Sequence, residues 1–284
     1  MTALPFFSVI VPTYRRPERL AACLRALAGL DYPRERFEVI VVDDGGGATL
    51  EGAPTTIDVT LVTQVHAGPA AARNTGAARA RGEYLGFTDD DCAPEAGWLR
   101  GLAAHAVAGS DRLIGGRTVN ALPDNPYSSA TQLLLDYLYE WGARHGDDGF
   151  FASNNVAAPA SLFRARGGFD TGFPLAAGED RELCHRWLRA GGRLVHAPGA
   201  VVRHEHHLTL RSFWRQHVNY GRGARRFHRV RGGGGTGKPP SFYARLVTFP
   251  LTRADADRRL ALAALLALTQ VATATGYWRE RLRP

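Results

Sequence analysis

Three consecutive aspartates, Asp89, Asp90 and Asp91, follow the short apolar run 84–87 and are the residues of this sequence best suited to chemistry. Adjacent carboxylates repel one another unless they are solvated or neutralised, and carboxylate oxygens are the ligands that Mg²⁺ and Mn²⁺ prefer. On an extended chain Asp89 and Asp91 would point to the same side, so that two carboxylates could share one cation. A solvated acidic turn without a metal is the alternative interpretation.

The segments around this cluster alternate between strand and helix patterns. Apolar runs predict strands, and helical spacing of apolar or alanine residues predicts helices. In chain order these are 7–11 (strand), 17–28 (helix), 37–42 (strand), 59–65 (strand), 69–80 (helix) and 84–87 (strand). This order is typical of a doubly wound α/β fold with a mostly parallel sheet. Since ligands bind at the carboxyl ends of such strands, we expect Asp43, Asp44 and the three aspartates at one edge of the sheet.

The pattern after Cys92 is less regular. It predicts helices, strands and one loop in the order 95–108 (helix), 113–117 (strand), 128–141 (helix), 142–149 (loop), 151–155 (strand), a short helix ending at 166, a helix from 178, and short strands at 193–196 and 200–203. The glycine-rich stretch 232–238 begins like a phosphate-binding loop, but Pro239 replaces the hydroxyl residue that would ligate Mg²⁺. We interpret it as a flexible linker.

Composition and charge limit the function classes. The chain has 284 residues, enough for one large domain or a domain with an appendage, and 45% of them are hydrophobic. A net charge of +8 favours anionic partners, which include nucleotide phosphates, anionic lipids and nucleic acid. Three widely spaced cysteines indicate neither a disulfide framework nor a Cys-x-x-Cys metal site. The segment 1–5 lacks the features of a secretory signal, so we expect the catalytic part in the cytoplasm.

The last third of the sequence has two segments of uncommon composition. The basic and aromatic segment 209–228 has the character of an interfacial amphipathic helix, or of a solvated basic helix that packs onto the domain through its aromatic rings. The segment 260–278 has no charged residue, is flanked by arginines and just reaches the roughly 18 to 20 residues that span a bilayer. It is rich in alanine and threonine, so a buried or surface-lying helix is an equal alternative to a span. We favour a membrane-associated tail, at the inner face of the cell membrane.

Six motifs together resemble family 2 glycosyltransferases of the GT-A fold. They occur in the order and rough spacing of that family between Phe7 and His204, whereas the chain after His207 lies outside the resemblance. The motifs are Val9-Ile10-Val11-Pro12-Thr13-Tyr14, Val41-Val42-Asp43-Asp44-Gly45, Ala72-Arg73-Asn74-Thr75-Gly76, Phe87-Thr88-Asp89-Asp90-Asp91, Gly167-Gly168-Phe169-Asp170 and Gly178-Glu179-Asp180.

The resemblance implies inverting transfer of a sugar from a nucleotide-diphosphate donor to an acceptor hydroxyl, with Mn²⁺ or Mg²⁺ as cofactor. The acceptor would be a carbohydrate or a lipid-linked molecule, in cell-envelope glycan or glycolipid synthesis, and no nucleic acid is expected as a partner. It also implies a Rossmann-like GT-A domain over 1–207, with a nucleotide-binding half at 1–92 and an acceptor half at 93–207. A helical extension, basic and apolar, would follow at 208–284.

The resemblance also assigns roles by position in the motifs. Asp89 and Asp91 would hold the cation, with Asp91 favoured as the direct ligand, and His204 would be an additional ligand; a histidine in a solvated loop is the alternative. The residues expected to bind the donor nucleotide are Pro12, Thr13, Tyr14, Asp43, Asp44, Arg73 and Asp90.

The remaining acids, Glu179 and Asp180, begin a predicted helix. Asp180 matches the position of the family's general base, and Glu179 is the alternative base or an acceptor-binding residue. Physical reasoning agrees, because a bound cation offsets the charge of the leaving diphosphate while a carboxylate takes the proton of the attacking hydroxyl. Ordinary helix capping by these acids is the alternative.

Two other functions remain open from sequence. One is a sugar-phosphate nucleotidyltransferase, although such enzymes carry a glycine-rich phosphate loop after the first strand, and the segment 12–16 contains no glycine. The other is a non-enzymatic protein that binds membranes or nucleic acid through its basic C-terminal part.

Overall fold

The computed structural model describes residues 4–107, 110–145, 149–232 and 238–282. The chain forms two compact units. The first comprises Met1–Val119 and Phe150–Glu205, and the second comprises Asn120–Gly149 and His206–Pro284. Residues 146–148 of the predicted loop and 233–237 of the predicted linker lie outside the described residues.

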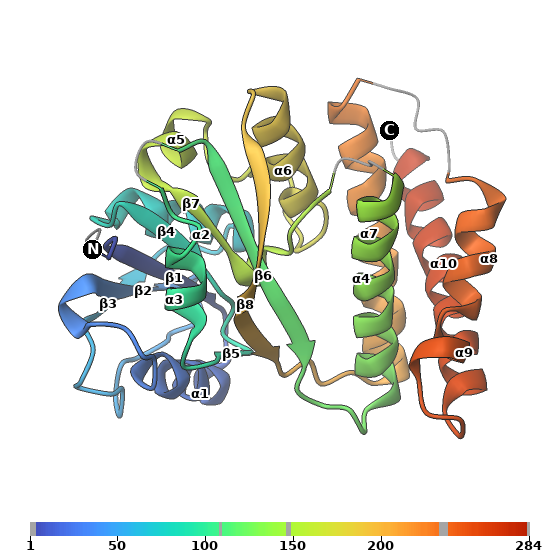
Figure 1. The fold of residues 1–284 in the computed structure, drawn as a ribbon, viewed down its shortest axis with the longest axis horizontal. Coiled ribbons are helices and arrows are strands. Elements are labelled where there is room, and N and C mark those ends of the chain that lie inside the picture. Colours follow the sequence, from blue (N-terminus) through green and yellow to red (C-terminus); the bar gives the residue numbers. More distant parts are fainter. Residues whose placement is uncertain (1–3, 108–109, 146–148, 233–237, 283–284) are drawn as a thin grey trace. The chain divides into compact units, whose positions relative to one another are not determined.

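An eight-stranded sheet forms the centre of the first unit, with the order β3-β2-β1-β4-β7-β6-β8-β5 (Figure 1). Its strands are β1 (Phe7–Thr13), β2 (Phe37–Asp43), β3 (Val59–Thr63), β4 (Tyr84–Phe87), β5 (Cys92–Pro94), β6 (Arg112–Asn120), β7 (Val156–Pro159) and β8 (Arg193–His204). β1 to β4 pair in parallel. The pairs β4–β7, β6–β7 and β5–β8 are antiparallel, so the sheet is mixed rather than mostly parallel.

Helices cover both faces of this sheet because alternate strand residues point to opposite sides. Val9 and Val11 belong to one core with Cys23 and Trp98, whereas Ile10 belongs to the other core. The first core includes residues of α1 (Pro17–Ala28), α3 (Trp98–Ala103) and β5. The second includes residues of α2 (Pro69–Arg79), α5 (Ala160–Ala165) and α6 (Glu179–Arg189). Two short 3₁₀ helices, η1 (Arg34–Arg36) and η2 (Ser153–Asn155), complete the unit.

The described part of the second unit is helical. It contains α4 (Pro126–His145), α7 (Leu210–Val230), α8 (Pro240–Thr248), α9 (Pro250–Arg253) and α10 (Arg259–Arg281). Thr209 caps α7 reciprocally with Ser212, which fixes the start of that helix. By length and composition α10 could cross a membrane, and core helices of soluble proteins can have the same length and composition.

Glycines bring α7 and α10 into close contact within this unit. A Cβ built at Gly221 would lie 1.9 Å from the carbonyl oxygen of Thr273, and one built at Gly276 would lie 1.9 Å from that of Val218. Any larger side chain at either position would overlap the backbone of the facing helix.

The structure differs from the sequence-based expectations in several places. The helix predicted at 95–108 covers only Trp98–Ala103, the strand predicted at 151–155 is a 3₁₀ turn before β7, and the two strands predicted after 193 are the single strand β8. Residues 142–145 of the predicted loop continue α4. The two compact units divide the chain after Val119, Gly149 and Glu205, and residues 120–149 group with the C-terminal helices. The domain bounds 1–207 and 208–284 stay a prediction.

Candidate active site

Parallel pairing places the two acidic segments at one edge of the sheet. Thr13, the last residue of β1, is in register with Asp43 at the end of β2, and its hydroxyl donates a hydrogen bond of 2.8 Å to Asp90. β4, on the other side of β1, ends at Phe87 just before the acidic cluster. The expected gathering of acids at the carboxyl ends of these strands is therefore present.

The acidic cluster itself is not extended. The chain turns at residues 90–91, where the N–H of Cys92 donates to the carbonyl oxygen of Asp89 at 3.1 Å. As a result Asp89 and Asp91 have different partners: Asp89 pairs with Arg73, and Asp91 pairs with His204. The expectation that both carboxylates point to one side, which assumed an extended chain, is wrong.

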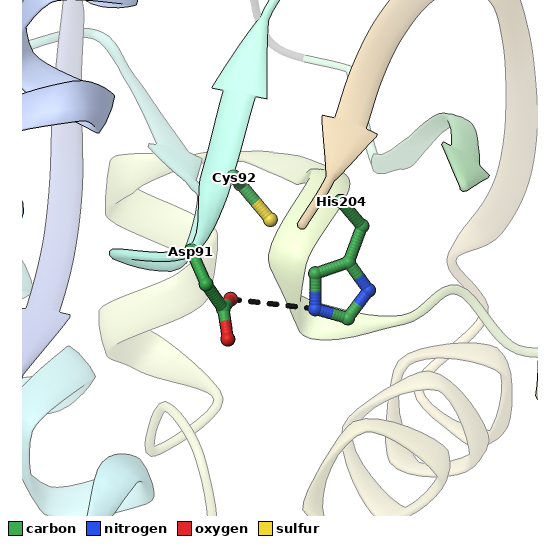
Figure 2. Close-up of side chains that lie close together, drawn as sticks. All are labelled: Asp91, Cys92 and His204. Carbon is green, nitrogen blue, oxygen red and sulfur yellow. Dashed lines mark ion pairs between the residues drawn. The ribbon is translucent and has the colours of Figure 1, made fainter. Parts of the chain in front are cut away.

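Asp91, Cys92 and His204 form a group of side chains that could hold a metal ion (Figure 2). Their ligand atoms lie within 4.8 Å of one another, and Asp91 Oδ1 is 3.3 Å from His204 Nε2. Antiparallel pairing of β5 and β8 produces this arrangement, since Cys92 is in register with His204. The main chain also joins the two sides, because the N–H of Glu205 donates to the carbonyl oxygen of Asp91 at 2.8 Å.

The chemistry of this group fits a hard divalent cation at two of its three members. A carboxylate oxygen and an imidazole nitrogen suit Mn²⁺, whereas thiolates select softer metals. Burial raises the pKa of the Cys92 thiol well above its ordinary value. Burial lowers the pKa of His204, but its hydrogen bond to Asp91 and the charge of that carboxylate outweigh burial and raise it overall. Asp91 and His204 therefore have the ligand atoms that suit a hard cation, whereas Cys92 offers a softer sulfur and belongs to one of the two cores.

Two arginines that the sequence interpretation missed, Arg16 and Arg19, contact the same acids. Arg16 Nη1 lies 3.1 Å from Asp90 Oδ1 and 3.2 Å from Asp91 Oδ2, and Arg19 Nη1 lies 3.1 Å from Asp91 Oδ2. Burial raises the pKa of Asp90 to about 6, against the opposing charge of Arg16. A sequence signal existed, since both arginines occur at the start of the helix after β1, but nothing in it indicated which acids they meet.

Arg73 connects the acidic cluster to the Gly-Glu-Asp turn, in which Glu179 lies 106 residues after Arg73. Its side chain is buried, with Nη2 at 2.7 Å from Asp89 Oδ1 and Nη1 at 3.3 Å from Glu179 Oε1. Its guanidinium also lies 5.4 Å from the centre of the Phe169 ring. The structure thus brings four of the six motifs to one place.

Glu179 and Asp180 begin α6 after Gly178, whose φ of 93° is accessible to glycine at little cost. Glu179 is 2% exposed, and its second oxygen, Oε2, has no partner among the described residues. Asp180 is surrounded by protein but keeps an intermediate exposed surface. Its Oδ1 accepts a hydrogen bond of 2.8 Å from the N–H of Arg181.

The electrostatics of this pair follow from its burial. Burial, and secondly the charge of Asp180, raise the pKa of Glu179 to about 7. Burial also raises the pKa of Asp180, although Arg181 lowers it. The two carboxyls therefore take up a proton closer to neutral pH than isolated carboxyls do.

Asp43 and Asp44 shape the loops beside the site. The Asp43 carboxylate accepts hydrogen bonds from the main-chain N–H groups of 46, 47 and 48. The Asp44 carboxylate accepts those of 67 and 68 and pairs with His66 at 2.8 Å. Tyr14 stacks on the His66 ring at 4.4 Å, and Pro12 is buried in β1. Sequence reasoning missed His66, because a single histidine in a loop gives no signal.

A comparison with family models decides the classification. Residues 8–166, more than half of the chain, match the model of "Glycosyl transferase family 2". The chain belongs to glycosyl transferase family 2. Residues 94–278 also match the model of "Glycosyl transferase family group 2". The family likeness therefore extends beyond His207, although we expected the chain after that residue to lie outside it.

Relatives of this family 2 member include the pre-mycofactocin glycosyltransferase of Mycobacterium tuberculosis, which is 32% identical over 225 residues. That match covers 75% of this chain and 46% of the relative. The chain spans about half the length of the curated relatives it matches.

Solved structures share the fold of this family 2 chain. A mannosyltransferase of Pyrobaculum calidifontis, in complex with GDP-Man and Mn²⁺, superposes with a TM-score of 0.61 at 21% identity, covering 95% of this chain and 76% of that one. Residues 1–349 of TarS from S. aureus, in complex with UDP-GlcNAc, superpose with a TM-score of 0.53 at 20% identity, covering 96% and 89%. These likenesses confirm the expected GT-A type of α/β fold.

Proposed function

We propose that the chain is a metal-dependent inverting glycosyltransferase that moves a sugar from a nucleotide-diphosphate donor to a hydroxyl of a carbohydrate or lipid-linked acceptor. A role in cell-envelope glycan or glycolipid synthesis is part of the proposal. The observation that carries it is the bridge made by Arg73, because one buried guanidinium contacts both Asp89 of the acidic cluster and Glu179 beside the expected base. Relatives named glycosyltransferases support the same reaction class.

Residues at the end of β1 and β2 would bind the donor. Tyr14, on its His66 stack, offers a ring face to the base, and the loops held by Asp43 and Asp44 border the same edge. Asp91 and His204 would hold Mn²⁺ or Mg²⁺, with Asp89 near by on Arg73. When bound, the cation offsets the negative charge that develops on the leaving diphosphate. Donor complexes of the two solved neighbours are consistent with this assignment.

Asp180 would act as the general base. Glu179 is buried and held by Arg73, whereas Asp180 retains exposed surface toward which an acceptor hydroxyl can approach. A base with a raised pKa holds the transferred proton more firmly, which favours its transfer from the attacking hydroxyl. Glu179 then orients Arg73, and its Oε2, which has no partner in the described part of the chain, would accept a hydrogen bond from a substrate hydroxyl.

The first prediction concerns the two acids with separate roles. Asp91→Asn and Asp180→Asn should each lower turnover of a sugar nucleotide at least a hundredfold, because one loses a cation ligand and the other the base. Mass spectrometry of products, after incubation with a panel of sugar nucleotides, candidate acceptors and Mn²⁺, measures this. Asp31→Asn, which alters an exposed acid paired with Arg100, is the matched control.

Three outcomes would count against the proposal. An Asp180→Asn variant with unchanged turnover would remove the assigned base. Release of pyrophosphate from a nucleoside triphosphate and a sugar phosphate would instead indicate the nucleotidyltransferase alternative. Membrane or nucleic-acid binding without any turnover, unaffected by either substitution, would indicate the non-enzymatic alternative.

We also propose peripheral membrane contact through α10, on the cytoplasmic face. Leu260, Val271 and Trp278 on this helix are 78%, 57% and 53% exposed. Arginines stand at both of its ends, at 258–259 and at 279 and 281. Exposed apolar side chains between cationic ends suit the boundary between acyl chains and anionic head groups.

A further inference from the structure

Arg16 and Arg19 place two positive charges against the carboxylates of Asp90 and Asp91, one of which is an expected cation ligand. The carboxylates are buried, with 4% and 8% of their side-chain surface exposed, whereas the two arginines are 49% and 31% exposed. Buried carboxylates require a positive partner, because an uncompensated buried charge is strongly unfavourable. The more exposed guanidiniums can be solvated after they leave, so the cost of releasing them falls mainly on the buried carboxylates and is offset when a cation takes the place of the arginines.

The two oxygens of Asp91 face different groups. Oδ1 is the atom near His204, and Oδ2 is the atom that both arginines contact. A divalent cation held by Asp91 and His204 would therefore lie close to two guanidiniums of the same sign. Like charges that lie close together repel strongly in a partly buried site. The cation and the arginines therefore compete for the carboxylate of Asp91.

Local geometry allows the arginines to move without unfolding the site. Arg16 is the residue just before α1 and Arg19 lies in its first turn, next to β1, whose end borders the expected donor pocket. Long, partly exposed side chains at a helix start can turn toward the end of β1 by rotamer changes alone. A nucleotide diphosphate offers the planar, bidentate oxygen pairs that guanidinium groups recognise.

We propose that Arg16 and Arg19 pair with the carboxylates of Asp90 and Asp91 until a divalent cation binds there. The two guanidiniums then move and pair with the oxygens of the donor diphosphate. This inference rests on the proposed function. The two binding events are therefore linked. A cation that binds alone must displace both arginines from the carboxylates, and the displaced arginines are then free to pair with the donor. Cation and donor must then bind cooperatively, each raising the affinity for the other by the same factor.

The test measures binding rather than turnover. Free Mn²⁺ is followed by electron paramagnetic resonance in the presence of the full chain, and UDP and GDP are titrated calorimetrically with and without Mn²⁺. The variants are Arg16→Gln, Arg19→Gln and the double variant, with Arg19→Lys as the form that keeps the charge. Arg25→Gln is the control, because it removes the same charge from an exposed position of the same helix.

The expected result is a change of opposite sign in the two affinities. The Gln variants should bind Mn²⁺ alone threefold to tenfold more tightly, because a competing positive charge has been removed. The factor by which Mn²⁺ raises the affinity for UDP or GDP should be at least fivefold smaller in these variants than in the wild type. Arg19→Lys should retain most of the wild-type behaviour. Circular dichroism of each variant establishes that the fold is intact.

Other outcomes would overturn the inference. Weaker binding of Mn²⁺ alone in the Gln variants would mean that the arginines only orient Asp91, and affinities equal to those of Arg25→Gln would mean that they do neither. Tighter Mn²⁺ binding with unchanged diphosphate affinity would rule out the transfer to the donor. A wild-type chain that binds neither Mn²⁺ nor a diphosphate would contradict the proposed function itself. This failure differs from a failure of the inference, because it is seen in the wild type alone, without any variant.

Discussion

Asp180 and its neighbour Arg181 offer a test at the scale of single residues. Burial raises the pKa of Asp180, and the charge of Arg181 is the largest opposing influence. A general base works only when deprotonated, so turnover should be present above this pKa and lost as pH falls through it. Arg181→Gln removes the opposing charge, and we expect the acid limb of the kcat/KM profile to move to higher pH.

A control and a contrary outcome define this test. Arg189→Gln removes an equal charge from an exposed position at the end of the same helix, and should leave the acid limb in place. An acid limb that moved to lower pH in Arg181→Gln, or that moved equally in both variants, would contradict the assignment of Asp180 as the titrating base.

At this scale the sequence predicted residue types better than contacts. The motifs drew attention to Asp89, Asp91 and Asp180, the family resemblance added His204, and the structure places Asp91 against His204. The pairing of Arg73 with Glu179 joins residues 106 positions apart, and no local pattern encodes it. The turn at 90–91 was missed because an extended strand was assumed through the aspartates, whereas β4 ends at Phe87.

Gly221 and Gly276 provide the test at the scale of elements. Each faces a backbone carbonyl of the partner helix, at 1.9 Å from an added Cβ. Gly221→Ala should therefore force α7 and α10 apart and lower the free energy of unfolding by about 1–3 kcal/mol, the usual cost of overpacking. Thermal or urea denaturation of the full chain measures the loss.

Gly142→Ala is the matched control within the same unit. Gly142 lies in α4, and an added Cβ would contact nothing within 4 Å. Alanine there should raise the free energy of unfolding by about 0.5–1 kcal/mol, because glycine is a poor helix former. If Gly221→Ala were as stable as Gly142→Ala, the close packing of α7 on α10 would be incorrect.

Regular elements could be predicted and irregular ones could not. The first four strands and two helices have apolar periodicity that is clear in the sequence, and all were found near their predicted bounds. β5 has three residues, too short for a pattern, although it carries the pairing that brings Cys92 opposite His204. The antiparallel pairing of β7 with β4 depends on contacts between distant segments, so a mostly parallel sheet was the natural expectation.

At the scale of the whole molecule, charge and apolar exposure predict membrane binding. A chain of net charge +8 with exposed Leu260 and Trp278 should co-sediment with vesicles containing anionic lipid more than with neutral ones. Salt should weaken the binding by screening. Leu260→Ser with Trp278→Ser should lower the affinity for anionic vesicles severalfold, since less apolar area is buried.

Val65→Ser is the control for that experiment, because Val65 is 89% exposed and lies in the first unit. Equal binding of all variants, or binding that neither lipid charge nor salt affects, would exclude α10 as the contact. The composition of the whole chain indicated anionic partners, but it did not show which apolar side chains remain exposed. The exposed side chains can be identified only once the packing of the helices is known.

The positions of the three cysteines have a practical consequence. Cys23 and Cys92 lie in one core of the first unit and Cys184 in the other, all buried, and burial raises the pKa of each thiol. Alkylating reagents attack thiolates, so these sulfurs react only when a face of the sheet opens. In variants that keep a single cysteine, the rate of alkylation measured by mass spectrometry would therefore report how fast each face of the sheet opens, without dyes or engineered labels.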